Sequence, residues 1–79
     1  MTNIFPITLR YALRALARDD CQEVVTKLIN NGIICEYSRA VGELEKGGIV
    51  EKVIINGNLC FKLSEFGRKL IINILKVVE

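Results

Sequence analysis

Three segments in the first half of the chain repeat apolar residues at intervals of three and four, the spacing typical of an amphipathic helix. The first begins near Pro6, which suits the first turn of a helix because the missing N–H is not needed there. Arg10, Arg14 and Arg18 recur every four residues and should form a basic stripe, either a solvated face or one turned toward phosphates or a partner. The residues expected on the buried face of this helix are Leu9, Ala12, Leu13, Leu16 and Ala17.

The second and third segments predict two further helices. Asp20 is expected to cap the second, since Glu23 lies three residues later in the spacing of a capping box. Gly32 should end this helix, because glycine readily takes the left-handed conformation found at helix C-termini. The third helix is predicted over residues 36–46, ended by the glycine pair that follows, with one apolar side formed by Tyr37, Ala40, Val41 and Leu44.

After the glycine pair the pattern favours strands, and it predicts a β-hairpin over residues 49–63. Asn56-Gly57 is a strong signal for a two-residue type I′ turn, which fixes the register of the two strands. The expected opposed pairs are Ile55 and Asn58, Ile54 and Leu59, Val53 and Cys60, Lys52 and Phe61, and Glu51 and Lys62. The expected core face comprises Ile54, Leu59, Phe61 and Leu63, while Glu51 and Lys62 form an opposite-charge pair on the other face.

Ser64 is expected to cap a final helix over residues 64–79. Its apolar residues form a wider face than a small monomer needs for its own core, and the surplus apolar surface suggests a partner. The order helix, helix, helix, strand, strand, helix indicates an α+β fold, mostly helical. We expect a single domain of residues 1–79, with a core over 1–63 and a C-terminal helix over 64–79. The wide apolar face of that helix is formed by Phe66, Leu70, Ile71, Ile74, Leu75 and Val78.

Composition places the chain among globular proteins, with 51% hydrophobic and 25% charged residues. No apolar run reaches the roughly 18 residues that span a bilayer, so we expect a soluble, cytoplasmic protein without a membrane partner. The net charge of +2 permits nucleic-acid binding without arguing for it. A strong electrostatic footprint would have a pI above about 9.

Little in the chain is suited to catalysis, because histidine is absent and the nine acidic residues are scattered. No glycine-rich phosphate loop is present. We therefore expect no enzyme, no catalytic residue, no metal site, no cofactor and no small-molecule ligand. Cys21, Cys35 and Cys60 are expected to be small buried apolar residues. A single disulfide is the open alternative, for a protein from a hyperthermophile.

Two motifs flank the predicted turn: "YSRAVGELEKGGIVEK", residues 37–52, and "CFKLSEFGRKLI", residues 60–72. Together they resemble the winged helix-turn-helix DNA-binding domains of the MarR, ArsR and PadR type. The first is similar to the recognition helix of these domains, which runs into "LExxGLV" and the hairpin wing. The second is similar to their wing strand, "LTxxG" and last helix. The motifs cover about a third of the chain, and the element order covers nearly all of it.

The resemblance implies that the third helix enters the major groove, which is wide enough to admit it, and that the wing lies along the backbone or minor groove. Arg39 is the best candidate for a base contact, because its planar fork matches guanine O6 and N7. The alternative is a surface arginine paired with Glu36 or Glu43. Gly42, inside the helix, would allow close approach of DNA or of another helix. The residues expected at the DNA are Ser38, Arg39, Gly42, Glu43, Lys46, Lys52, Asn56, Gly57, Asn58 and Lys62.

The resemblance also implies a homodimer through the first and last helices. The expected function is therefore that of a small homodimeric, sequence-specific transcriptional regulator that binds double-stranded DNA. The alternative is a winged helix for protein–protein contact within a transcription or replication assembly. Glu36, Glu43 and the apolar loop "NNGIIC" depart from the family pattern. The weak net charge, the two glutamates and the apolar last helix favour that alternative. The residues expected at the dimer interface are Leu9, Leu13, Leu70, Ile71, Ile74, Leu75 and Val78.

Overall fold

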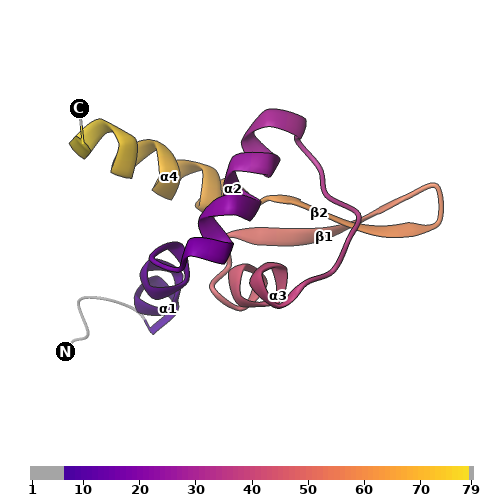
Figure 1. Ribbon diagram of the computed structural model, residues 1–79, viewed down its shortest axis with the longest axis horizontal. Helices are drawn as coiled ribbons and strands as arrows, with labels where there is room; N and C mark the ends of the chain where they lie inside the picture. Colours follow the sequence, from indigo (N-terminus) through magenta and orange to yellow (C-terminus); the bar gives the residue numbers. More distant parts are fainter. Residues whose placement is uncertain (1–6, 79) are drawn as a thin grey trace.

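A computed structural model describes residues 7–78, with side chains described for residues 9–74 (Figure 1). The predicted position of Pro6 therefore lies outside the described residues. As predicted, the fold is α+β and mostly helical, and the elements follow the expected order. They are α1 (Ile7–Leu16), α2 (Asp19–Asn31), α3 (Arg39–Lys46), β1 (Val50–Ile55), β2 (Asn58–Leu63) and α4 (Glu65–Val78).

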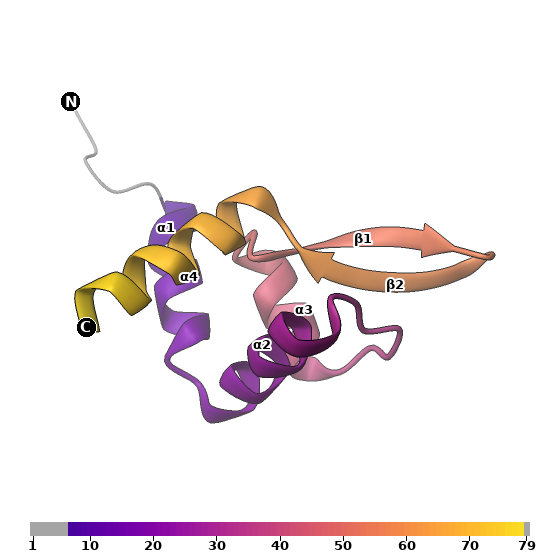
Figure 2. The same ribbon diagram turned by 90° about the horizontal axis from the view of Figure 1, so that it is seen from above.

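The three N-terminal helices form a body from which the other elements extend in opposite directions. α3 packs against both α1 and α2, the β1–β2 hairpin projects from one end, and α4 leaves at the other end (Figures 1 and 2). The molecule is consequently elongated, with extents of 44 × 31 × 20 Å. The core residues are Ala12, Ala15, Cys21, Val25, Leu28, Ala40, Val41, Leu44, Ile49, Val50 and Phe61.

Helix α1 buries a narrower stripe than its sequence predicts. Ala12 is fully buried, but Leu13 is 46% exposed and Ala17 is exposed, so the prediction is wrong for the last two. Ala15 takes their place in the core. Small residues are buried here because α1 crosses close to the end of α3: a Cβ added at Gly47 would lie 3.0 Å from the Ala12 Cα.

Helix α2 begins two residues earlier than predicted, and the expected cap by Asp20 is wrong. Arg18 occupies the N-cap position and makes no side-chain cap hydrogen bond. Its guanidinium instead donates two hydrogen bonds to the Asp20 carboxylate, at 3.0 and 2.8 Å. This paired geometry lowers the pKa of Asp20 to about 2. The predicted end is confirmed, since Gly32 has a φ of 85° and its N–H donates to Leu28 O at 2.8 Å.

Helix α3 begins at Arg39, three residues later than predicted, because the preceding segment is held elsewhere. Ile34 forms an antiparallel bridge with Phe61, with hydrogen bonds of 3.0 and 2.7 Å. Ile34 is therefore held against β2, and Ser38 then caps α3 by accepting from the Val41 N–H at 3.2 Å. Tyr37 lies outside the helix and is 69% exposed, so its predicted place on the buried side is wrong.

The hairpin has the predicted register, and all five expected pairs are confirmed. Asn56 and Gly57 have φ values of 52° and 81°, both positive as a type I′ turn requires. Glu51 and Lys62 form the expected ion pair, at 3.8 Å.

The expected core face of the hairpin is only half right. Phe61 is buried and Leu63 is half-buried near the helices, but Ile54 is 65% exposed and Leu59 is 45% exposed. Alternation predicts which side chains share a face, but not how far the body beneath that face extends. The outer half of the hairpin projects beyond the helices (Figure 1).

The cysteines do not all behave as small buried apolar residues. Cys35 and Cys60 form a disulfide, with their Cα atoms 3.9 Å apart, which is the alternative that the sequence left open. Cys60 is buried as predicted, whereas Cys35 is exposed. The bond fastens the segment before α3 to the face of β2 opposite Phe61. Cys21 is free and buried as predicted, and burial raises the pKa of its thiol.

Ser64 caps α4 as predicted and also ties α4 to the start of the hairpin. Its Oγ accepts from the Gly67 N–H at 2.8 Å and donates to the carbonyls of Gly48 and Ile49. Gly67 is buried beside the Ile49 carbonyl, where a Cβ would collide with the oxygen. Within the described residues, no helix is long and apolar enough to cross a membrane.

We predict that Gly67→Ala lowers the free energy of unfolding by about 1–3 kcal/mol, because the added methyl collides with the Ile49 backbone. At an ordinary position inside a helix, the change from glycine to alanine would raise the free energy of unfolding by about 0.5–1 kcal/mol. Urea unfolding followed by circular dichroism measures the difference.

Gly42→Ala is the matched control, since Gly42 is also helical. Its new methyl would meet only the exposed end of the Tyr37 side chain, which can rotate away. We expect this variant to be as stable as the parent or more stable. Equal gains at Gly42 and Gly67 would contradict the packing described for α4.

We predict that the disulfide stabilises the fold by about 3 kcal/mol, because it closes a loop with a sequence separation of 25. Dithiothreitol should lower the Tm of the parent protein and leave a Cys35→Ala/Cys60→Ala variant unchanged. Alkylation of the denatured protein without reductant should label Cys21 alone. Labelling of all three cysteines would refute the bridge.

Candidate nucleic-acid interface

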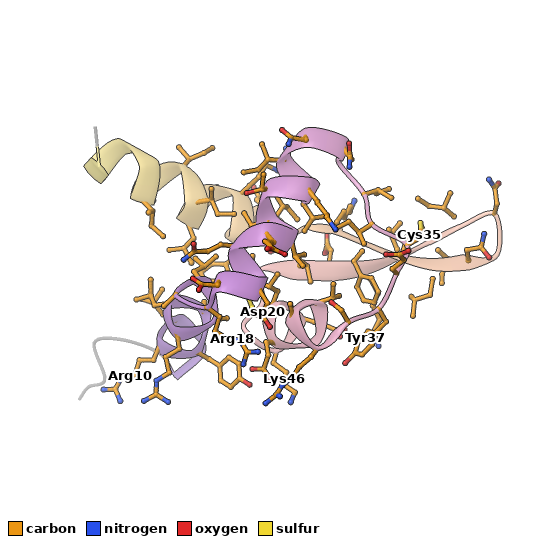
Figure 3. All side chains as sticks on the ribbon, in the orientation of Figure 1. Arg10, Arg18, Asp20, Cys35, Tyr37 and Lys46 are labelled. Carbon is orange, nitrogen blue, oxygen red and sulfur yellow. A yellow bond between two sulfur atoms is a disulfide. The ribbon has the colours of Figure 1, made fainter. Side chains whose placement is uncertain are left out.

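Basic side chains from α1, from the N-cap of α2 and from α3 gather on one side of the helical body. We define this basic face as Arg10, Arg14, Arg18, Arg39 and Lys46. Figure 3 shows Arg10, Arg18 and Lys46 along the same side of the molecule as Tyr37. Arg14 and Arg18 line a hollow of about 360 Å³ with Tyr11 and Glu43. Among the described residues, no ion pair involves Arg10, Arg14 or Arg39, so three of the five cations are available to an external anion.

Arg39 and Lys46 are the first and last residues of α3, and both are exposed. The expected exposure of Arg39 is confirmed, and the alternative of an ion pair with Glu36 or Glu43 is not observed among the described residues. Ser38, the other residue expected at the start of this helix, uses its oxygen to cap the helix. An N-cap oxygen only accepts in this arrangement, so the Ser38 O–H remains a donor for an outside group.

The middle of α3 is less accessible than predicted. Gly42 is buried, because the Tyr37 ring lies over it and a Cβ there would collide with the Tyr37 hydroxyl. The close approach that glycine permits is therefore made by Tyr37, and the predicted open surface at Gly42 is wrong. The ring of Tyr37 also packs on Phe61, with centroids 6.1 Å apart and planes tilted by 50°. Tyr37 thus connects the surface of α3 to the hairpin.

Glu43 is half-buried and turned toward α1 rather than fully outward. Its carboxylate accepts a hydrogen bond of 2.7 Å from the Tyr11 O–H and lies 3.9 Å from the Lys46 ammonium. The hydrogen bond lowers the pKa of Glu43, with further lowering by Lys46, Arg18 and Arg39, and it raises the pKa of Tyr11. Glu43 is therefore an ionised residue that joins two helices within the basic face.

The hairpin residues predicted to contact DNA are only partly brought together. Lys52 lies opposite Phe61, on the face that continues from α3, and forms an ion pair of 3.5 Å with Glu45. Lys62 lies on the other face of the hairpin, paired with Glu51. The two lysines therefore point to opposite sides and do not share one surface. Asn56, Gly57 and Asn58 are exposed at the tip.

The residues predicted for a dimer interface differ in how exposed they are. Leu70 and Ile71 pack against the protein's own core, and Leu9 is half-buried, so these three are less available than expected. Leu13 and Ile74 are exposed. Leu75 and Val78 belong to α4, but their side chains lie outside the described residues. Ile29 and Ile72, which were not predicted at this interface, are also exposed.

Two residues of this region were missed by sequence reasoning: Tyr11, which holds Glu43, and Tyr37, which covers Gly42. Tyr11 and Glu43 are 32 residues apart, and no local spacing connects them. Tyr37 was predicted to lie inside the third helix, because its spacing to Val41 and Leu44 fits a helix that begins before Ser38.

Comparison of the chain with protein-family models, with curated proteins and with solved structures gives no match. The function of the site therefore has to be inferred from the chemistry of its own residues. Within the described part of the chain, no three acidic, cysteine or histidine side chains are grouped to hold a metal ion. What the basic face offers is a row of exposed guanidinium and ammonium groups, which suits a polyanion with regularly spaced charges.

We predict that Tyr11→Phe destabilises the protein only over the pH range in which the Tyr11–Glu43 hydrogen bond exists. The lowered pKa of Glu43 contributes stability that is fully present above its ordinary value of 4.5 and is lost as the pH falls through the folded-state value. The raised pKa of Tyr11 contributes stability that is present below 10.0 and is lost at higher pH. Urea unfolding over a pH series measures this.

Tyr37→Phe serves as the control, because the Tyr37 hydroxyl has no hydrogen bond to another described side chain. Its stability difference from the parent should not vary across the same acidic range. A Tyr11→Phe difference that stays constant as the pH falls below 4 would show that the bond contributes nothing in solution.

Proposed function

We propose that this protein is a small homodimeric winged helix that binds double-stranded DNA sequence-specifically and acts as a transcriptional regulator. The observation that carries the proposal is the basic face, in which α1 and α3 present exposed cations beside a projecting hairpin. The net charge of the chain is only +2, so concentration of cations on one side is what makes a DNA-facing surface.

Arg39 is the proposed base-reading residue. It is exposed at the first position of α3, where the positive end of the helix dipole favours an approaching anion. α3 has eight residues and is about 12 Å long, and an α-helix with its side chains is about 10–12 Å across, which a major groove of about 12 Å width admits. The planar guanidinium would then donate two hydrogen bonds to guanine O6 and N7, and the Ser38 O–H would donate to a neighbouring phosphate or base.

Arg10 and Arg14 are proposed to bind phosphates on the strand that flanks the groove. Both are exposed and lie one turn apart on α1, which packs directly against α3. Contacts of this kind set the position of the protein on the duplex but carry no sequence information. In this proposal Glu43 positions α3 against α1 through Tyr11 and does not read a base.

A homodimer is proposed through the exposed apolar residues of α1 and α4. Leu13, Ile72 and Ile74 are exposed on these helices, and α4 extends away from the body (Figure 2). Two-fold symmetry would place two α3 helices in successive major grooves, so the preferred site would be a palindrome with half-sites about one helical turn apart.

Protein–protein contact within a larger assembly is the second candidate. It is favoured by the apolar hollow between α2 and α4, which has a volume of about 330 Å³ and lies apart from the basic face. Its lining includes Ile29 and Ile74, both exposed. Binding to such a surface would respond little to salt, whereas DNA binding weakens steeply between about 50 and 200 mM salt.

We predict that Arg39→Ala weakens specific DNA binding by about 1–3 kcal/mol and relaxes the preference at one base position. The test selects duplexes from random DNA with the parent protein and then titrates both proteins against the best sequence at several salt concentrations.

Arg68→Ala is the matched control, since Arg68 is an exposed arginine on α4, outside the basic face. It should bind as the parent does. The proposal fails if the parent selects no sequence and binds duplex DNA with no salt dependence. Arg39 loses its base-reading role if its removal weakens binding equally at every sequence.

A further inference from the structure

A row of exposed apolar side chains runs from α3 out along one face of the hairpin. Ile54 and Leu59 are directly opposed in the hairpin register, and both are among the most exposed large apolar residues described. Phe61 is the next residue on the same face of β2, and Tyr37 packs on its ring. We define the apolar row as Tyr37, Leu59 and Ile54, with the buried Phe61 beneath its inner end.

Such a row is unusual on a hairpin that projects into solvent. Alternation normally places polar side chains on a face that nothing covers. Here the face that supplies Val50 and Phe61 to the core continues outward with isoleucine and leucine, beyond the reach of the helices. The opposed pair therefore extends an apolar surface to the outer half of the hairpin, next to the Asn56-Gly57 turn.

The charges around the row indicate what can cover it. Arg39 follows Tyr37 by two residues and is exposed, while Lys52 lies opposite Phe61 on the same face as Ile54. Tyr37 lies on the same side of the molecule as Lys46 and Arg10 (Figure 3). Lys52 is paired with Glu45, so Arg39 is the cation near the row that has no ion pair among the described residues. The partner should therefore be apolar where it meets the row and anionic where it meets Arg39.

We propose that the apolar row inserts into the DNA minor groove and partly unstacks a base step, which bends the duplex. This inference rests on the proposed function. A minor groove has phosphates along both edges, and base steps opened within it accept aliphatic side chains such as isoleucine and leucine. In this arrangement Ile54 and Leu59 form the wedge, and Tyr37 lies where α3 and the hairpin meet. Lys52 leaves its ion pair with Glu45 and binds a phosphate instead.

The geometry also favours a wedge over a flat contact along the backbone. The hairpin bears its two described lysines on opposite faces, each already paired with a glutamate, so it has little free charge for phosphates. Its large exposed side chains are instead aliphatic, and they lie at the position where a projecting hairpin would reach the groove next to the one occupied by α3.

The test compares the full-length parent with Ile54→Thr/Leu59→Thr, which keeps one β-branched residue and introduces another in exposed strand positions. The probe is a duplex of about 30 base pairs, selected with the parent from random DNA and carrying fluorophores at both ends for energy transfer. Titration gives the affinity, and the transfer efficiency of the bound duplex gives the bend. Circular dichroism confirms that the variant is folded.

We expect the parent to bend the duplex by about 20–90° and the double variant to lose most of the bend, with about tenfold weaker binding. Ile29→Thr, which alters an exposed isoleucine on α2, should leave both values unchanged. Arg39→Ala should weaken binding while the duplex that remains bound is still bent. This result separates the wedge from base reading.

Four results would overturn the wedge. A double variant with parental affinity and bend would show that the row does not enter the groove. A bound duplex that stays straight with the parent would reject the wedge and leave the proposed DNA binding intact. A double variant that binds normally but sediments with a smaller mass would assign the row to contact between copies. A parent that binds no duplex would reject the wedge and the proposed function together.

Discussion

The fold depends on one backbone segment, residues 47–49, where four elements meet. Gly47 allows α1 to approach within contact distance at Ala12, and a side chain there would separate the two helices. The Ile49 carbonyl accepts from the N–H and the Oγ of Ser64, at 2.9 and 3.1 Å, which joins the start of the hairpin to the start of α4. Gly67 then packs on the same carbonyl. The direction in which α3, the hairpin and α4 leave the body follows from these contacts.

A consequence of this junction is that the exposed surface of α3 is small and supported from both sides. Tyr11 fixes Glu43 from α1, and Tyr37 covers Gly42 from the hairpin side. Arg39 and Lys46, the first and last residues of the helix, are its exposed charged residues, while Glu43 and Glu45 are half-buried and paired with lysines. A surface of this kind can hold a few side chains in defined positions, but its specificity has to come from few contacts. The proposed contributions of α1 and of the hairpin would supply the remaining affinity.

Local chemistry in the sequence predicts the hairpin register, the end of α2 at Gly32 and the cap of α4 by Ser64, although the predicted cap by Asp20 is wrong. Asn56-Gly57 permits one turn, and the turn determines every pair in the sheet. The start of α3 is predicted wrongly, because it is set by the bridge between Ile34 and Phe61 and by the disulfide next to it, both between segments distant in sequence. The exposure of Ile54 is missed for a different reason. Alternation identifies a face of a strand, but only the size of the helical body determines where that face meets solvent.

The most direct test of the account is a map of the DNA-contacting surface by nuclear magnetic resonance, with isotope-labelled protein and a selected duplex. The account predicts the largest amide and side-chain shifts at Arg10, Arg39 and Lys46 and at the methyl groups of Ile54, all diminishing as salt is added. Methyl shifts confined to Ile29 and Ile74, unaffected by salt, would place the interface between α2 and α4 and contradict the basic face as the functional surface.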